Sequence, residues 1–164
     1  MIDDQILFTP LGMNLYREKI EELDDELKKL QAETAYIAEV GGDQYHDNAS
    51  YESLVIDIRG LDWRISEMHK ILNKSVIISH VVKDGKVRIG SIVKVIYWGK
   101  EACLHIVGYG ESDPKQNKIA YDAPLAALIM GKEEDDIVSG LIAGKKVEIE
   151  ILEITYNEEK CNDG

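Results

Sequence analysis

Two matching heptad patterns in the first half of the chain limit the folds that it can adopt. Mainly apolar residues recur at alternating spacings of three and four over residues 13–37, and again over residues 51–72. This is the spacing of the seam along which helices pack in a coiled coil. The first series is Met13, Tyr16, Ile20, Leu23, Leu27, Leu30, Thr34 and Ile37, and the second is Tyr51, Leu54, Ile58, Leu61, Ile65, Met68 and Leu72. Two such seams joined by a short segment predict an antiparallel helical hairpin.

Sequence signals mark the limits of the first helix. Thr9 followed by Pro10 is typical of a helix start, because threonine accepts a hydrogen bond from a free amide and proline has no amide hydrogen to leave unpaired. A glycine pair at positions 41 and 42 predicts the end, since glycine adopts the left-handed conformation common at helix ends without steric cost. Helices of this length would hold the segment between them on the order of 40 Å from the base of the hairpin.

The segment between the helices carries acidic side chains. Residues 41–51 read GGDQYHDNASY and include Asp43 and Asp47. From spacing alone, the favoured interpretation is structural: Asp47 or Asn48 caps the second helix, and Asp43 is a turn residue. Carboxylates are also ligands that Mg²⁺ commonly takes, so the pair equally fits delivery of oxygen ligands to a metal ion. His46, between them, could bind a metal or respond to pH.

The hydrophobic period changes to two after residue 75, which predicts antiparallel strands. Alternating runs cover residues 76–82, 87–98, 102–110, 137–142 and 147–151, and the pattern breaks at positions 151 and 152 in a way that suggests a β-bulge. A short helix is expected from Pro124 to Gly131. The predicted fold class is α+β: a coiled-coil hairpin over residues 1–75 with its tip at 41–51, a β domain over 76–156, and a flexible tail over 157–164.

Charge and composition narrow the class of partner. The formal net charge is −12, and residues 1–75 hold 16 acidic and 8 basic side chains. Such a surface repels nucleic acid at long range, so a protein with a basic entrance or a bound metal is the better match. No apolar run approaches the roughly 20 residues of a membrane span, and no signal peptide is evident, so we expect a cytoplasmic protein that does not bind membranes. Cys103 and Cys161 suggest neither a disulfide framework nor a zinc site.

Three stretches together resemble the bacterial Gre-type transcript cleavage factors, and the GreA branch in particular. The tip is similar to the family pattern Gly-Asp-x-x-Glu-Asn-Ala-x-Tyr, which Asn48, Ala49 and Tyr51 match directly. The stretch QNKIAYDAPLAALIMGKEEDD resembles the C-terminal signature of the family, and TPLGMNLYREKIEEL resembles the start of its first helix. The C-terminal signature is the most specific of the three matches, and its GKEEDD segment is intact. We expect a polymerase-docking or structural role for the residues of that segment, Gly131, Lys132, Glu133, Glu134, Asp135 and Asp136.

The resemblance implies a mechanism. The hairpin of a Gre factor enters the secondary channel of bacterial RNA polymerase, while an FKBP-like C-terminal domain grips the rim of the channel. The RNA 3′ end of a backtracked complex is extruded into that channel. Asp43 and Asp47 would then act as the catalytic acids that help to hold a Mg²⁺ ion at the active centre of the polymerase, with His46, Asn48 and Tyr51 supporting the tip. The protein would bind no metal stably by itself, would be no enzyme by itself, and would act as a monomer.

One departure from the family pattern leaves an alternative open. The family has two residues between its acids and uses Glu second, whereas this chain has three residues between Asp43 and Asp47. A Gre-like paralogue that occupies the same channel and inhibits or modulates the polymerase without strong cleavage is therefore the second hypothesis. A prolyl isomerase ranks low, because few aromatic residues are available to line a peptide pocket. A coiled-coil adaptor unrelated to polymerase is the fourth hypothesis.

Overall fold

The computed structural model describes residues 5–41 and 48–156 and confirms an α+β fold. The chain divides into two compact units, one helical and one β-rich. Asn14–Ser75 belong to the helical unit, whereas Ile6–Met13 and the chain from Val76 onward form the β unit. The division after Ser75 coincides with the predicted boundary, but the segment Ile6–Met13, predicted as part of the hairpin, belongs to the β unit. None of the described helices is long and apolar enough to cross a membrane.

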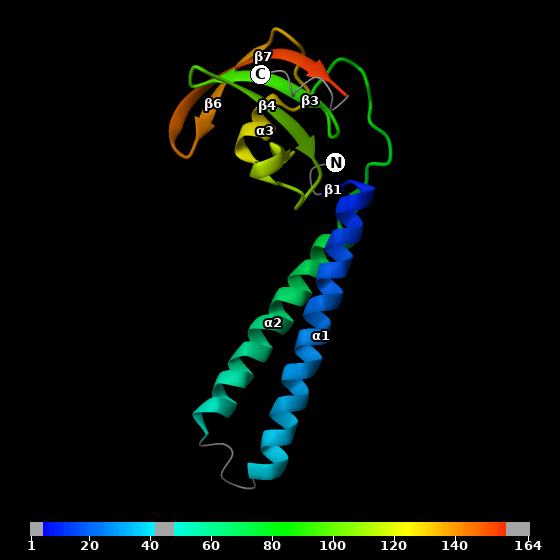
Figure 1. The fold of residues 1–164 in the computed structure, drawn as a ribbon, viewed down its shortest axis with the longest axis vertical. Coiled ribbons are helices and arrows are strands. Elements are labelled where there is room, and N and C mark those ends of the chain that lie inside the picture. Colours follow the sequence, from blue (N-terminus) through cyan, green and yellow to red (C-terminus); the bar gives the residue numbers. More distant parts are fainter. Residues whose placement is uncertain (1–4, 42–47, 157–164) are drawn as a thin grey trace. The chain divides into compact units, whose positions relative to one another are not determined.

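The helical unit is an antiparallel hairpin. Helix α1 (Pro10–Gly41) and helix α2 (Ala49–Asn73) run alongside each other in opposite directions (Figure 1). Every predicted seam residue from position 16 to 37 and from 51 to 72 is buried or half-buried, while most other positions of both helices are exposed. The heptad pattern therefore identified the packed faces of both helices correctly.

Burial along the hairpin is uneven. Ile20 and Leu23 on α1 are each 4% exposed, and Ile65 on α2 is 6% exposed. No described residue between positions 24 and 64 is fully buried, so the seam residues nearer the connecting segment are all half-buried. Apolar burial contributes roughly 25 cal/mol per Å², so the region around Leu23 and Ile65 stabilises the hairpin more than the region near the connecting segment does.

The β unit is built on a five-stranded sheet with the order β5-β4-β3-β7-β6. Its strands are β3 (Ile92–Tyr97), β4 (Lys100–Val107), β5 (Lys118–Ala120), β6 (Ile137–Ile142) and β7 (Lys145–Thr155). All neighbours are antiparallel except β4 and β5, which run parallel and correct the expectation of an entirely antiparallel domain. The connection between β4 and β5 contains the short 3-10 helix η2 (Pro114–Gln116).

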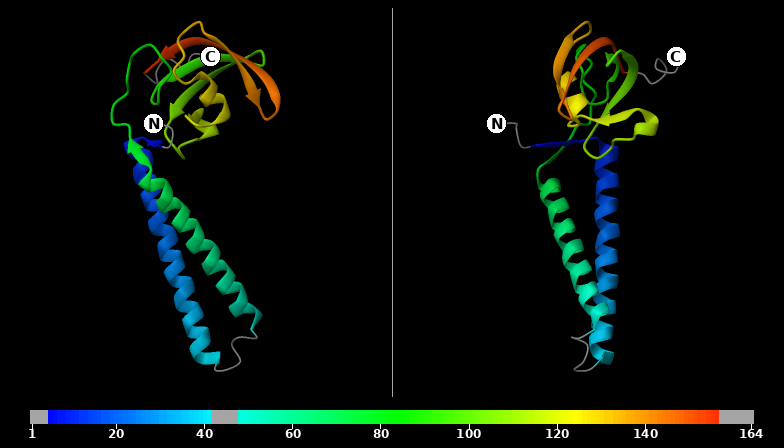
Figure 2. Two further views of the ribbon diagram at one scale, coloured as in Figure 1. Left: turned by 180° about the vertical axis from the view of Figure 1, so that it is seen from behind. Right: turned by 90° about the vertical axis from the view of Figure 1, so that its left-hand side faces the viewer.

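A short helix covers one face of this sheet. Helix α3 (Pro124–Ile129) begins and ends within two residues of the predicted limits, and it lies against the sheet in the views of Figures 1 and 2. A Cβ added to Gly140 of β6 would lie 2.5 Å from Leu128 of α3, so the helix approaches the strand closely there. The core comprises Val87, Val93, Val95, Leu104, Ile106, Ala126, Ile129, Val147, Ile149, Ile151 and Ile154.

Two predicted strands are shorter in the structure. The run 76–82 contributes only to β2 (Ser75–Ile77), which pairs with β1 (Ile6–Phe8) in a separate two-stranded sheet. The run 87–98 becomes a strand only at Ile92, because Gly90 has a φ of 90° and interrupts the extended chain. The predicted bulge is confirmed, since the register of β3 against β7 shifts between Lys94 and Val95.

One buried residue of the β unit comes from the segment that precedes the hairpin. Phe8, far from the unit in sequence, is 0% exposed, and its ring centroid lies 5.4 Å from that of Tyr109.

Candidate functional site

The residues predicted to act at the tip are only partly described. Asp43, His46 and Asp47 lie outside the described residues, so their roles stay predictions. Their flanks are described: α1 ends at Gly41, and α2 begins at Ala49 after its N-cap, Asn48.

Asn48 starts α2 by capping it. Its Oδ1 accepts a hydrogen bond from the Ser50 amide at 2.9 Å, and its carbonyl oxygen accepts from the Glu52 amide at 3.1 Å. The backbone of Asn48 is extended, with φ −90° and ψ 113°, as is usual for a residue in this position. Asn48 therefore fixes where α2 begins. Tyr51 is half-buried in the first turn of α2, at a seam position.

The part of the hairpin around the tip contains acidic residues but no lysine or arginine. Lys29 and Arg59 are separated by a stretch without Lys or Arg. This stretch holds six carboxylates, those of Glu33, Glu39, Asp43, Asp47, Glu52 and Asp57. The four that are described are exposed and form no ion pair with any described residue. Negative charge therefore accumulates around the connecting segment without local compensation.

Ion pairs occur elsewhere on the same helices. Lys19 pairs with Glu22 at 2.8 Å, Lys28 with Asp25 at 3.2 Å, and Lys70 with Glu67 at 2.6 Å. Each pair is exposed and lies within one helix, so each contributes little to stability. The lysines of these pairs lie outside the stretch between Lys29 and Arg59, so the hairpin has basic side chains but none of these three is near the tip in the sequence.

Uncompensated carboxylates favour cations, and their hard oxygen atoms suit Mg²⁺, which is commonly bound by one or two carboxylates together with phosphate and water. In residues 5–41 and 48–156, no three His, Cys, Asp or Glu side chains lie together as a metal site. That the tip acids supply oxygen ligands to a Mg²⁺ ion therefore stays a prediction.

The predicted signature at residues 131–136 forms a loop of the β unit. The Gly131 amide donates to the Val87 carbonyl oxygen at 2.9 Å, and the Lys132 carbonyl accepts from the Val87 amide at 2.8 Å. Gly131 has a φ of 75°, a conformation that glycine adopts without strain. The Glu133 amide donates to Asp136 Oδ2 at 2.9 Å. These contacts give Gly131, Lys132 and Asp136 a structural role.

The same loop supports the bulged strand β7. Glu134 Oε1 accepts a hydrogen bond from the Ile154 amide at 2.8 Å. The Asp135 amide donates to the Ile151 carbonyl at 2.9 Å, and the Ile151 amide donates to the Asp136 carbonyl at 3.0 Å. Strand β6 pairs with β7 only as far as Glu150, so these main-chain groups of β7 lie beyond the end of β6, and the loop satisfies groups that the sheet does not. A docking role for the exposed surface of this loop stays a prediction.

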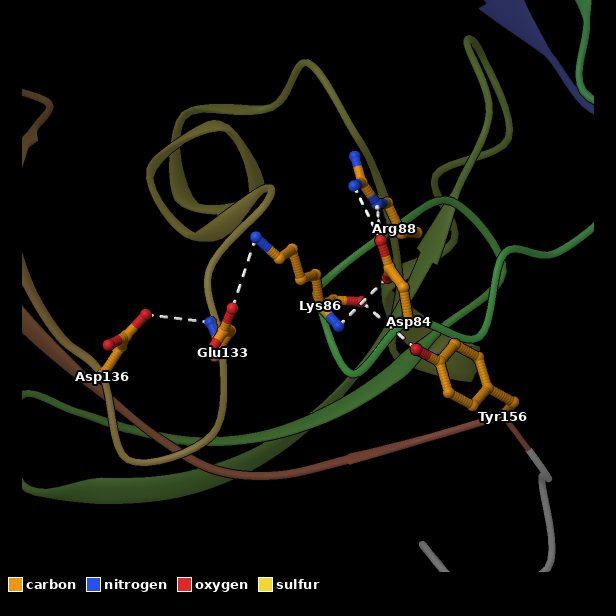
Figure 3. A network of polar contacts seen from close by, with 6 residues as sticks. All are labelled: Asp84, Lys86, Arg88, Glu133, Asp136 and Tyr156. Atoms are coloured by element: carbon orange, nitrogen blue, oxygen red, sulfur yellow. Dashed lines mark hydrogen bonds and ion pairs between the residues drawn. The ribbon is translucent and has the colours of Figure 1, made fainter.

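A polar network next to this loop was not predicted (Figure 3). Lys86 Nζ lies 3.3 Å from Glu133 Oε1, and the Lys86 carbonyl accepts from the Tyr156 hydroxyl at 3.3 Å. Asp84 Oδ2 accepts from Arg88 Nη2 at 2.8 Å, and this hydrogen bond is the main reason why the pKa of Asp84 is lowered. The charged residues at every second position from 84 to 88 were the available signal, but they do not identify the distant partners.

The fold and the charge distribution define a class of protein: a helical hairpin with an acidic tip, followed by a β unit with one short helix. Residues 82–156 match the family described as "Transcription elongation factor, GreA/GreB, C-term". The transcription elongation factor GreA of Halalkalibacterium halodurans is 34% identical over 146 residues, which cover 87% of this chain and 92% of the relative. GreA of Legionella pneumophila strain Corby is 35% identical over 150 residues, with coverages of 85% and 93%.

Solved structures of related proteins are also similar. Gfh1 of Thermus aquaticus gives a TM-score of 0.44 at 19% identity, covering 92% of this chain and 98% of the other. The GreA/GreB factor of Nitrosomonas europaea gives a TM-score of 0.39 at 17% identity, covering 93% and 98%. On the identity and coverage of its sequence relatives, the chain belongs to the GreA/GreB family of transcription elongation factors.

Proposed function

We propose that this elongation factor binds bacterial RNA polymerase, inserts its hairpin into the secondary channel, and stimulates cleavage of backtracked nascent RNA. The observation that carries the proposal is the uncompensated acidic stretch between Lys29 and Arg59, at the end of two long helices. Helices of 32 and 25 residues reach far beyond the radius of a small domain, at about 1.5 Å per residue. Such a hairpin is suited to carry ligands into a narrow channel.

The tip acids contribute metal ligands and no active centre of their own. Asp43 and Asp47 would present carboxylate oxygens to a Mg²⁺ ion at the active centre of the polymerase, near the extruded RNA 3′ end. When bound, such an ion can orient or ionise an attacking water. Asn48, next to Asp47 in the sequence, caps α2 and so fixes the start of that helix. The hydrolysis itself is assigned to the polymerase.

The test is RNA cleavage by a stalled, backtracked polymerase with the wild-type protein, Asp47→Asn and Asp43→Asn. Loss of a supporting ligand lowers metal affinity by roughly 10–100-fold, so we expect cleavage stimulation to fall by about tenfold or more. Asp62→Asn is the matched control, because it removes the same charge from an exposed position of α2 outside the acidic stretch between Lys29 and Arg59. If the wild-type protein adds nothing to cleavage by polymerase alone, the proposed function is wrong.

A second candidate function is favoured by the spacing of the tip acids. Three residues separate Asp43 from Asp47, whereas the family pattern has two residues between its acids and Glu as the second acid. In this alternative the hairpin occupies the same channel and inhibits or modulates the polymerase without strong cleavage of RNA. Inhibition of nucleotide addition without RNA hydrolysis, retained in Asp47→Asn, would select it.

A further inference from the structure

Strand β6 is an unprotected edge of the five-stranded sheet. It pairs with β7 on one side, and no described strand pairs with its other side. Its sequence, IVSGLI, contains no charge and no proline, and its register with β7 is continuous. Natural sheets usually protect an edge with charge, proline, a bulge or a very short strand. The opposite edge follows this rule, because β5 has only three residues.

The side chains of β6 form two distinct rows. Val138, Gly140 and Ile142 are half-buried, and Gly140 faces Leu128 of α3. The alternate residues Ile137 and Leu141 are 62% and 65% exposed. Because alternate residues of a strand point to opposite faces, these two apolar side chains lie on the face of the sheet that α3 does not cover, with the small Ser139 between them.

Two carboxylates border this apolar row. In the register of β6 with β7, Ser139 lies opposite Glu148 and Ile137 lies opposite Glu150. Both glutamates are exposed, and neither forms an ion pair with a described residue. The carboxylate of Glu101, also on this sheet, differs because it pairs with Lys94 at 3.1 Å. Lys146, opposite Leu141, lies on the same face and forms no ion pair with a described residue. The two carboxylates outnumber this one lysine, so the face next to β6 keeps a net negative charge, and neither Glu148 nor Glu150 is paired with a described residue.

Glu148 lines two hollows in the surface of the sheet. An open hollow of about 550 Å³ is lined by Ser139, Gly140, Leu141, Lys146, Val147 and Glu148. A second hollow of about 240 Å³ is lined by Ile96, Trp98, Gly99, Glu148 and Glu150. The Trp98 ring is 54% exposed, and its Nε1 donates to the Lys146 carbonyl at 3.2 Å, which orients the ring.

We propose that β6 accepts an extended segment of another protein as an additional strand, and that this segment carries a basic residue flanked two positions away on each side by apolar residues. Main-chain hydrogen bonds to the free edge provide affinity, as in other cases of strand addition. The two apolar side chains cover Ile137 and Leu141. The basic side chain passes over Ser139, which is small, toward the unpaired carboxylate of Glu148.

Charge complementarity favours such a segment over a second copy of this chain. In antiparallel pairing of two β6 strands about Ser139, Ile137 of each copy would lie opposite Leu141 of the other, which is sterically suitable. No positive charge would then meet Glu148, and each copy would bring its own unpaired carboxylates to the joined sheet. Self-pairing therefore supplies no counter-charge to Glu148, whereas a basic residue in an added segment does, so self-pairing is the disfavoured occupant.

The probe is a labelled peptide with the core Ile-Thr-Lys-Thr-Ile, compared with a matched peptide in which Glu replaces Lys. Fluorescence anisotropy measures affinity, and nitrogen-15 NMR shifts of the full-length protein locate the site. Charge pairs at interfaces contribute enough that we expect the Lys peptide to bind about tenfold tighter or more than the Glu peptide. The shifted amides should belong mainly to β6 and its neighbours.

Two variants and one control make the test specific. Glu148→Lys should reverse the preference between the peptides, and Leu141→Lys should weaken binding of both. Val82→Lys, a change at another exposed apolar residue of the β unit, should leave affinity unchanged.

Equal affinity for the two peptides, no effect of Leu141→Lys, or NMR shifts that depend on protein concentration without peptide would each overturn the proposal, the last in favour of self-pairing. No polymerase is present in this experiment, so its outcome is independent of the cleavage assay.

Discussion

The Glu111 carboxylate accepts hydrogen bonds from two segments that are far apart in the sequence. Its Oε1 accepts a hydrogen bond from the Thr9 hydroxyl at 2.7 Å, and its Oε2 accepts from the Gly108 amide at 2.9 Å. Thr9 Oγ1 in turn accepts from the Gly12 amide at 3.0 Å and so caps α1. A carboxylate beside a helix N-terminus is also stabilised by the helix dipole. Gly12 and Gly108 leave the space for it, since a Cβ on either would lie within 2.6 Å of Glu111.

The same substitution should have opposite effects at two glycines. A Cβ on Gly108 would lie 2.7 Å from the Thr9 main-chain nitrogen, so Gly108→Ala must move the backbone. We expect it to lower the free energy of unfolding by about 1–3 kcal/mol, as overpacking does. Gly60→Ala in α2 meets nothing within 4 Å and should raise it by roughly 0.5–1 kcal/mol through helix propensity. Thermal unfolding of both full-length variants checks the signs, and a stabilising Gly108→Ala would contradict the account.

The pH dependence of Asp84 follows from Arg88. The hydrogen bond from the Arg88 guanidinium lowers the pKa of Asp84 below its ordinary value of 3.8. A carboxyl whose pKa is lower in the folded state stabilises the fold above its unfolded pKa, and this contribution is lost as pH falls through the folded pKa. The relevant window therefore lies below pH 3.8. Arg88→Met should raise the pKa of Asp84 toward its ordinary value in an NMR titration, whereas an unchanged pKa would exclude the Arg88 contact as its cause.

Among the elements, the hairpin varies most in packing along its length. Ile65 is 6% exposed, whereas Leu54, nearer the connecting segment on the same seam, is only half-buried. Ile65→Ala should therefore cost about 2–5 kcal/mol, the usual range for a buried site, and Leu54→Ala clearly less. Urea unfolding followed by helical circular dichroism measures both. Equal losses would mean that packing is uniform along the hairpin.

Considered as a whole molecule, the chain does not divide at one point in its sequence. The N-terminal segment belongs to the β unit: the Tyr109 amide donates to the Leu7 carbonyl at 2.8 Å, and the Tyr121 hydroxyl accepts from the Leu7 amide at 3.1 Å. Phe8 is fully buried beside Tyr109. The β unit therefore depends on residues that precede the hairpin.

Phe8→Ala tests this dependence in the full-length protein. Removing a buried aromatic side chain usually costs 3–5 kcal/mol, and we expect about that loss in the unfolding free energy of the β unit. Methyl NMR signals from valine and isoleucine residues of the sheet report on that unit directly. Leu11→Ala is the control, because Leu11 belongs to the same segment but is 61% exposed, and it should change stability by less than about 0.5 kcal/mol. A loss confined to the hairpin signals would contradict the assignment of Phe8 to the β unit.

The features predicted correctly from the sequence depend on neighbouring residues. The heptad seams, the caps at Thr9 and Asn48 and the helix beginning at Pro124 each arise from spacings of a few residues, because helix faces and helix ends are local properties. The break at positions 151 and 152 predicted the bulge for the same reason. The candidate tip acids were also identified by local pattern, and their roles stay predictions.

The sequence by itself thus determined the two packed helix faces, most helix limits and the acidic character of the tip. Only the tertiary structure decided that β1 completes the β unit, that β5 runs parallel to β4, and that Glu134 supports the bulged strand. Each of these depends on segments far apart in the chain, and hydrophobic or charge patterns do not specify which distant segment will be the partner. A free main-chain amide such as that of Ile154 arises only once the sheet has formed, so the carboxylate that satisfies it cannot be recognised earlier.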